Sequence, residues 1–400
     1  MKQYFSSKTI KLFIHSAIVL AISYLIASFF ISSTKFLSFF SVLDESGDVP
    51  MSDMYLKFNS RKTPVQLDTI ITFVDVDSCK DRLEIAQLIE QIDSLQPKVI
   101  GLDVFFRNRK NSEEDTALEN AIRKCNNLVV ACILGGEQQN DGDKYNTCKH
   151  YFFVDQKKDN LTEGFVNLDS DGSSPVETFT PQLILQKDES LDTLYCFAAQ
   201  VARLYDKTAF QKLLQRPGNL EVIPFQRLRF ETIEKDEIED NKEQITDKIV
   251  LIGSLSEDMH KTPINPQMHG MEIHAQVIST IIEGHKGNEE KYIDRLDNVW
   301  TKLMNGLLCY LFALFCWFAT SRLKSGITIL IKMVQVAILV LAFFTGYWLF
   351  NRYHIDITYT RTIIVMGVLI LIVDIYHVGI TLSHKWIFKP DKINNDESNN

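Results

Sequence analysis

Three aspartates stand at the ends of two apolar segments of this 400-residue chain. Asp75 and Asp77 close the segment ITFVDVD, and Asp103 lies near the end of KVIGLDVFF. If both segments are parallel strands, these acids meet at the carboxyl edge of the sheet, where open parallel sheets bind their ligands. Such a group could hold a cation or accept hydrogen bonds from a polar ligand. The alternative is structural: Asp77 would begin the next helix, and backbone groups would satisfy a buried Asp103.

A second acidic motif, NLDSDG, occupies residues 167–172. Its acceptors at the first, third and fifth positions and its glycine at the sixth resemble a calcium-binding loop. The twelfth position, which should hold a glutamate, is Thr178, and Glu177 lies one residue too early. We therefore expect a tight turn stabilised by side-chain hydrogen bonds, and we keep Asp171 as a candidate ligand-binding residue.

Histidines and acids also gather between residues 258 and 274, at Asp258, His260, His269, Glu272 and His274. Two histidines five residues apart in a helix point about 140° apart, unlike the four-residue spacing of zinc-binding helices. His274 shares a helix face with apolar residues and is expected in the core. We predict no metal, no cofactor and no catalytic residue, since the chain also lacks a G-x-S-x-G, P-loop or G-x-G-x-x-G motif.

The elements that must position these residues alternate between apolar strands and amphipathic helices. Strands are expected at residues 71–77, 98–106, 128–134, 220–223, 227–232 and 248–253. Helices are expected at residues 81–95, 113–124 and 191–205, and an amphipathic helix is expected to follow the Thr262-Pro263 turn and to end near residue 283. Near-continuous apolar strands separated by helices predict an α/β domain with a largely parallel sheet that is covered on both faces.

Four segments are long and apolar enough to cross a membrane, which requires about 20 apolar residues. We expect transmembrane α-helices at residues 12–34, 303–321, 326–350 and 361–383. They divide the chain into a cytoplasmic stub, an extracytoplasmic domain and a cytoplasmic tail, at residues 1–11, 35–298 and 384–400.

Basic residues set the expected orientation of these spans. Lysines and arginines cluster before the first span, after the second and after the fourth. By the positive-inside rule, this places both termini on the cytoplasmic side of the membrane, which we expect to be a bacterial inner membrane. The first span is expected to remain as an anchor, because its apolar run is longer than that of a signal peptide and no small-x-small site follows it. A cleaved signal sequence is the alternative.

Two charged residues lie inside the predicted spans. Lys332 and Asp374 fall at similar depth on neighbouring antiparallel helices, where an isolated charge costs on the order of 3 kcal/mol. We expect them to face each other as an ion pair. Alternatively, Lys332 reaches the lipid headgroups, and Asp374 is protonated or hydrogen-bonded.

The extracytoplasmic domain is strongly acidic. Residues 35–298 contain 46 of the 51 acidic and 30 of the 42 basic residues, a net charge of −16. Nucleic-acid binding requires a basic surface and is therefore not expected. Five of the seven cysteines lie in this domain without a C-x-x-C spacing, so an oxidising compartment would leave at least one of them as a thiol.

The segment KIVLIG is followed by DMHKTP (258–263) and GMEIHA (270–275), with VDVD, GLDVFF and NLDSDG upstream. This pattern resembles the second class of CHASE domains, extracellular sensory domains associated with histidine kinases and cyclases. The resemblance extends from about residue 70 to residue 284, and a single anchor, an outer domain and three further spans are also the family's arrangement. It implies structural roles for the motif residues Thr262, Pro263, Gly270, Glu272 and His274.

The sequence departs from the family at two points. The family's Asp-Gly turn is usually followed by an arginine, whereas Ser173 follows here. Family members also commonly continue into a kinase or cyclase, whereas this chain ends at Asn400. We therefore expect that a separate signalling protein supplies the output.

These observations predict a membrane-anchored sensory module and not an enzyme. It would bind a small ligand or envelope component through candidate residues Asp75, Asp77, Asp103, Asp171 and Asp258. Membrane lipid would surround its helices, and a homodimer is compatible with the sequence. Two alternatives are a constitutive scaffold that binds an envelope component and a membrane-anchored hydrolase that depends on Asp75, Asp103 or Asp258.

Overall fold

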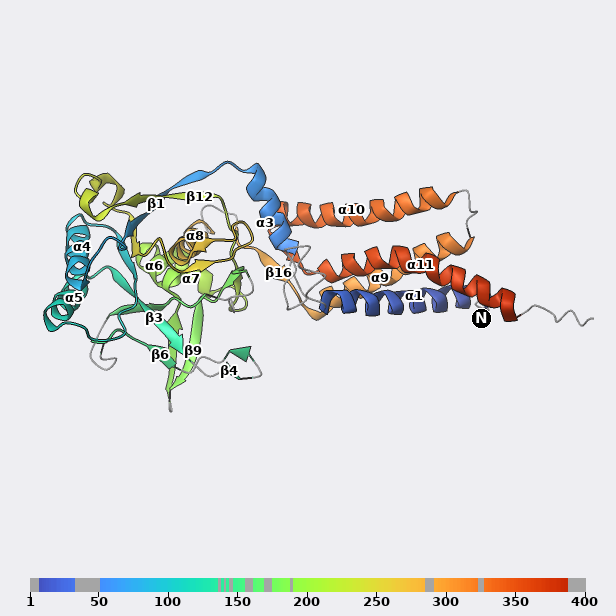
Figure 1. Ribbon diagram of the computed structural model, residues 1–400, viewed down its shortest axis with the longest axis horizontal. Helices are drawn as coiled ribbons and strands as arrows, with labels where there is room; N and C mark the ends of the chain where they lie inside the picture. The colour runs from blue at the N-terminus through green and yellow to red at the C-terminus, as the bar shows by residue number, and fades with distance from the viewer. Residues whose placement is uncertain are drawn as a thin grey trace, which may run out of the picture. The chain divides into compact units, whose positions relative to one another are not determined.

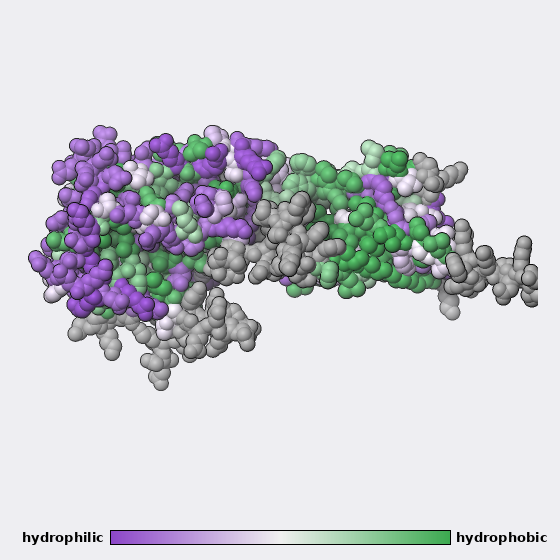
Figure 2. Space-filling model, in the orientation of Figure 1, coloured by the Kyte–Doolittle hydropathy of each residue, from purple (hydrophilic) through white to green (hydrophobic). Residues whose placement is uncertain are grey.

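The computed structural model describes residues 7–32, 51–135, 138–139, 142–143, 147–154, 161–168, 175–187, 190–284, 291–322 and 327–387. The chain forms two compact units. The α/β unit is Ser52–Asp294, and the helical unit joins Met1–Met51 to Arg295–Asn400. Hydrophilic residues dominate the surface of the α/β unit, whereas apolar residues cover the helices of the helical unit (Figure 2).

A seven-stranded sheet forms the centre of the α/β unit (Figure 1). Its strands are β1 (Gln66–Asp75), β2 (Val99–Asp103), β3 (Leu128–Gly135), β6 (Thr147–Lys149), β7 (Thr162–Phe165), β12 (Leu228–Ile233) and β13 (Ile249–Gly253). Their order is β12-β1-β13-β2-β3, and β3 also pairs with β6 and β7. These pairs are parallel except for β3 with β6, which confirms the largely parallel sheet.

Helices cover both faces of this sheet (Figure 1). They are α4 (Arg82–Ser94) and α5 (Ser112–Lys124) on one face, and α6 (Phe197–Tyr205), α7 (Lys207–Leu214) and α8 (Gly270–Glu283) on the other. In β13, Val250 and Ile252 enter the core beneath α4 and α5, whereas Ile249 and Leu251 enter the opposite core. Successive side chains of a strand point to opposite faces, so a strand buried on both faces must be apolar throughout.

A buried ion pair joins α4 to α5. Arg82 Nη1 contacts Asp115 Oδ1, and Arg82 Nη2 donates to the carbonyl of Asn108 at 2.7 Å. The backbone N–H of Lys110 donates to the second Asp115 oxygen at 2.9 Å. Burial acts to raise the pKa of Asp115, but the hydrogen bonds from Arg82 and Lys110 outweigh it and hold this pKa below its ordinary value. Each buried charge therefore depends on the other.

The predicted helix at residues 191–205 is wrong in its first part. Strand β10 (Ser190–Tyr195) forms an antiparallel hairpin with β9 (Gln182–Lys187), and α6 begins only at Phe197. Cys196 separates the two elements, and its sulfur accepts a hydrogen bond from Ala199 N at 3.4 Å. Short apolar runs fit a strand and a helix equally well, and here the pairing with β9 decides.

Short elements complete the α/β unit. They are α3 (Met51–Lys62), β4 (Gln138–Gln139), β5 (Gly142–Asp143), β8 (Thr178–Phe179), β11 (Glu221–Val222), β14 (Met259–His260), β15 (Met268–His269) and the 3₁₀ turns η2 (Lys235–Glu237) and η3 (Lys242–Gln244). The β14–β15 hairpin leads from the end of β13 into α8.

Four long apolar helices make up most of the helical unit. They are α1 (Ser7–Ser32), α9 (Val299–Arg322), α10 (Thr328–Tyr353) and α11 (Thr360–Ile387). Each contains a stretch that is long and apolar enough to cross a membrane, as the sequence predicted. Val19, Phe312 and Leu369 bring α1, α9 and α11 into a shared core. Strand β16 (Asp294–Leu296), just before α9, pairs with β17 (Ile355–Ile357), which connects α10 to α11.

Candidate functional site

The carboxyl edge of the sheet aligns two of the predicted acids. Asp75 ends β1, Asp103 ends β2, and both pair with Gly253 at the end of β13. Neighbouring strands lie about 4.8 Å apart, so the two acids flank β13 at a separation of about two strand spacings. The predicted edge site therefore has β13, the last strand of this sheet in chain order, at its centre.

Asp77 holds the loop that follows β13. Its Oδ2 accepts hydrogen bonds from the backbone N–H groups of Leu255 and Ser256, at 3.2 and 2.9 Å. Burial acts to raise the pKa of Asp77, but hydrogen bonds from Ser254, Ser256 and Leu255 outweigh it and lower this pKa. Asp77 does not begin the next helix, because Asp81 is the N-cap of α4.

Asp258 connects this loop to the start of α8. Its backbone is left-handed, with φ 59°, and its carbonyl accepts a hydrogen bond from Gly270 N at 2.9 Å. Asp258 Oδ1 lies 2.8 Å from His260 Nε2, and this hydrogen bond holds the pKa of Asp258 below its ordinary value. A Cβ at position 270 would overlap the Asp258 carboxylate, so a larger residue there would require the Asp258 side chain to move.

Thr262 and Pro263 lie in the connection of the β14–β15 hairpin. Thr262 is buried, and its backbone N–H donates to the carbonyl of Asn265 at 2.8 Å. Asn265 N donates in return to Thr262 Oγ1 at 3.1 Å. This reciprocal pair closes the turn, and the structural role of the Thr-Pro motif stays a prediction.

The buried His274 and the half-buried Asp103 lie close enough at this edge to affect each other's pKa. Burial lowers the pKa of His274, and the nearby carboxylates of Asp103 and Asp258 oppose this effect. Burial also raises the pKa of Asp103, and His274 opposes that shift. The His274 ring packs edge-on against Phe197, with 5.3 Å between ring centroids. Burial, which favours the neutral form of each group, therefore has a larger effect on these pKa values than the attraction between the two groups.

Glu272 stabilises the first turn of α8. Its side chain accepts a hydrogen bond from the backbone N–H of His269, the N-cap of this helix. This is one half of a capping box. Burial raises the pKa of Glu272, whereas the hydrogen bond and the nearby His269 act to lower it.

Asp171 lies outside the described residues, but the first residue of its motif is described. Asn167 Oδ1 accepts a hydrogen bond from Leu134 N at 2.7 Å, so this oxygen binds the end of β3. Among the residues that the structure describes, no cluster of three or more His, Cys, Asp or Glu has a metal-binding arrangement. The acids and histidines of the edge can instead attract a cationic ligand and accept its hydrogen bonds.

The CHASE2 domain family matches this chain over residues 22–320, about three quarters of its length. The chain belongs to the CHASE2 family. Comparison with curated proteins and with solved structures gives no match. CHASE2 domains are extracellular sensory domains, and the four apolar helices fit a membrane protein of this kind. The sheet edge described above therefore lies within the sensory domain.

The helical unit of this CHASE2 protein contains a second group of polar residues, which the sequence reading missed. Arg295 Nε on β16 lies 3.1 Å from Asp356 Oδ2 on β17, and Asp356 is fully buried. Thr358 N donates to Leu296 O at 3.4 Å, and Asn305 of α9 donates to Thr358 O at 2.7 Å. In the sequence, only the segment IDI, which contains Asp356, pointed to this group of polar residues. No residue near Arg295 in the sequence identifies it as the partner of Asp356.

Lys332 and Asp374, the predicted intramembrane pair, meet between α10 and α11. Lys332 Nζ lies 2.8 Å from Asp374 Oδ2 and also donates to the carbonyl of Ile370 at 2.8 Å. The lysine thus contacts both a carboxylate and a backbone carbonyl of α11. This geometry fixes the rotation of α10 about its axis relative to α11.

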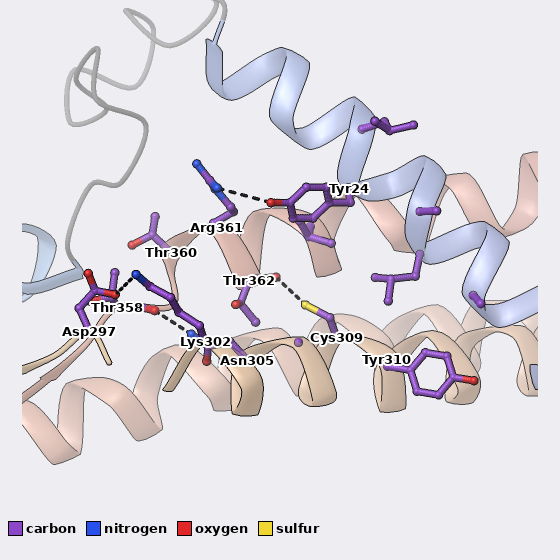
Figure 3. A pocket seen from close by; sticks show the side chains of 16 residues that line it. Tyr24, Asp297, Lys302, Asn305, Cys309, Tyr310, Thr358, Thr360, Arg361 and Thr362 are labelled. Atoms are coloured by element: carbon purple, nitrogen blue, oxygen red, sulfur yellow. Dashed lines mark hydrogen bonds and ion pairs between the residues drawn. The ribbon is translucent and has the colours of Figure 1, made fainter. Parts of the chain in front are cut away.

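A pocket of about 710 Å³ lies between α1, α9 and α11. Its polar end contains the ion pair of Lys302 with Asp297 at 3.2 Å, and Arg361, whose guanidinium is 3.5 Å from Tyr24 Oη (Figure 3). Small residues, Ala17, Ala21 and Gly306, form part of its wall. Its volume falls in the range of small-molecule sites, about 300–1,000 Å³.

Proposed function

We propose that this CHASE2 protein binds a small polar ligand or an envelope component outside the cytoplasm and signals through its helices to a separate protein. In this proposal the membrane is a bacterial inner membrane, both termini are cytoplasmic, and the acids at the sheet edge contribute to ligand binding. The observation that carries the proposal is the attachment of β16 to the connection between α10 and α11.

This attachment holds β16, the strand just before α9, firmly to β17, which connects α10 to α11. Strand β16 continues into α9 after only two residues, and an ion pair between the half-buried Arg295 and the fully buried Asp356 joins it to β17. Removing one partner of a buried ion pair typically costs about 3–5 kcal/mol, so the attachment resists separation. A displacement of the strand that leaves the sensory domain would consequently move α9 and the start of α11 together.

The helices also have room for such a movement. The 710 Å³ pocket leaves α1 incompletely packed against α9 and α11. A ligand shifts an equilibrium only when it binds one arrangement better than another, and an incompletely packed bundle can have two arrangements of similar free energy. The pocket therefore favours a bundle that changes conformation rather than one that serves only as a static anchor.

A spin-label experiment on the full chain in nanodiscs tests this coupling. Cysteines replace Leu25 on α1 and Leu307 on α9, both exposed, in a background without native cysteines. Gly270→Ala serves as the perturbation, because its Cβ pushes on the Asp258 carboxylate. We expect the distance distribution between the labels to shift in Gly270→Ala and to return toward wild type when Asp356→Asn is added. Leu220→Ala, at an exposed site of the α/β unit, is the control.

The possible outcomes separate the proposal from its main alternative. A constitutive scaffold predicts the same distance distribution in wild type, Gly270→Ala and the double variant, provided that all three remain folded. The partner is tested separately, by photo-crosslinking from the cytoplasmic tail in native membranes and identification of the captured protein. A captured kinase or cyclase whose activity changes in Gly270→Ala would support signalling, whereas unchanged activity would contradict it.

A further inference from the structure

We propose that the pocket between α1, α9 and α11 is a binding site for one anionic phospholipid. Its phosphate would lie at the polar end beside Lys302 and Arg361, and one acyl chain would follow the groove along Ala17, Ala21 and Gly306. The proposed function invokes the same pocket as room for helix movement, but this inference depends only on the residues that line it.

The three walls of the pocket change from apolar to polar in the same direction. On α1 the lining runs from Ala17 to Tyr24 and Leu25, and on α11 it runs from Val365 back to Arg361 and Thr360. On α9 it runs from Tyr310 and Cys309 back to Lys302, so the charged residues lie at one end although Tyr310 adds a hydroxyl at the other. Figure 3 shows the labelled charged and amide side chains gathered toward one end of the pocket. An occupant must therefore be polar at one end and apolar at the other.

The position of this gradient along the helices identifies the amphiphile as a membrane lipid. The polar ends of α9 and α11 are their N-terminal turns, and Tyr24, the polar residue of the α1 wall, lies in the C-terminal half of that helix. The helices are long enough to cross a membrane, so these ends lie at one interface, where lipid headgroups are. The apolar part of the groove then lies at the depth of the acyl chains.

Charge favours an anionic headgroup. Lys302 and Arg361 contribute two positive charges to the pocket lining, and Asp297 contributes one negative charge. Lys302 and Asp297 are both largely exposed, at 67% and 48%, so their ion pair is weak and Lys302 can turn toward a phosphate. Arg361 reaches the hydroxyl of Tyr24, which places a second donor at the same end.

Gly306 offers a specific way to close the groove. A Cβ at this position would meet no atom within 4 Å, so Gly306→Leu would add its side chain to the pocket without a clash at that carbon. Gly379 on α11 also has open space around its Cβ position, and it does not line the pocket. Gly379→Leu is therefore a matched control for the same change in helix composition.

Native mass spectrometry of the full chain in detergent tests the proposal. Delipidated protein is titrated with phosphatidylglycerol or with phosphatidylcholine of the same acyl chains. We expect one phosphatidylglycerol per chain to be retained, with an affinity about fivefold higher than that of phosphatidylcholine, the effect of about one net charge at the interface. Gly306→Leu should lower this affinity at least about tenfold, whereas Gly379→Leu should leave it unchanged. Lys302→Gln with Arg361→Gln should remove only the preference for phosphatidylglycerol.

Three results would overturn the proposal. They are the same retention by Gly306→Leu and Gly379→Leu, equal affinity for the two lipids, and displacement of phosphatidylglycerol by inorganic phosphate, which would indicate a site for free phosphate. If Gly306→Leu does not fold, the wild-type chain is photolabelled with phosphatidylglycerol that carries a diazirine in its acyl chain. Labelling must then fall on peptides containing Ala17–Ala21 or Gly306–Cys309, and labelling spread evenly over all four helices would refute a specific site.

Discussion

Replacement of Asp258 by alanine should destabilise the α/β unit by about 2 kcal/mol. Three contributions are lost. Alanine at the left-handed φ of 59° costs about 1 kcal/mol, whereas aspartate tolerates this region. The carboxylate beside the N-terminus of α8 contributes about 0.3–1 kcal/mol. Its hydrogen bond to His260 contributes about 0.2–1 kcal/mol, because the Asp258 side chain is 69% exposed.

Urea unfolding of the full chain, read by pulse proteolysis of the α/β unit, measures this loss. In thermal unfolding, the same loss of about 2 kcal/mol corresponds, for a unit of this size, to a decrease in Tm of about 4–8 °C. Two control variants separate the contributions. Asp258→Gly relieves the backbone strain but removes the carboxylate, and Asp258→Asn keeps a residue suited to φ above zero but removes the charge. Both should lose less stability than Asp258→Ala.

The effect should depend on pH with a definite sign. Because the pKa of Asp258 is lower in the folded protein than its ordinary value of 3.8, the ionised carboxylate stabilises the fold above that value. This contribution is lost as pH falls through the lowered pKa. The stability difference between wild type and Asp258→Asn should therefore be largest near neutral pH and should shrink toward pH 3. A constant difference, or wild-type stability in Asp258→Ala, would refute the reasoning, and lost ligand binding without lost stability would place Asp258 in the binding site.

Three further predictions use the buried charges and the spans. Asp115→Ala should lower the free energy of unfolding by about 3–5 kcal/mol in the same assay, because it leaves Arg82 buried without its partner. The double change Arg82→Met with Asp115→Leu should lower it much less. An equal loss of stability in both variants would contradict this explanation. Reversal of both Lys332 and Asp374 should restore the yield of folded protein lost in either single reversal, and a double variant as damaged as the sum of the singles would exclude a functional pair. A reporter enzyme active only outside the cytoplasm should work within Glu137–Asp159 and fail after the last residue, and activity at the tail would mean an odd number of spans.

Much of the fold follows from local pattern. The apolar runs that predicted strands correspond to β1, β2, β3 and β13, because a strand buried on both faces must be apolar throughout. The same uniformity hides the order of the strands. β13 lies between β1 and β2, although it follows them by more than a hundred residues, and any central strand could occupy that place by composition alone.

The candidate site was predictable only in part, for the same reason. Parallel strands align their carboxyl ends, so Asp75 and Asp103 were expected at one edge. Asp77 was expected to begin a helix or bind a ligand, but it holds the Leu255–Ser256 loop. That contact requires β13 as the neighbour of β1, which no residue near Asp77 reveals.

Hydropathy and charge in the sequence alone determined the four spans, the acidic outer domain and the alternation of strands with helices. These properties are local, because a helix satisfies its own backbone hydrogen bonds and about 20 residues suffice to cross a bilayer. Tertiary structure alone decided which charges meet, as in Arg82 with Asp115 and Arg295 with Asp356. Such pairs join residues far apart in the chain, so they form only where the packing of the intervening elements has already overcome the entropy of closing the loop between them.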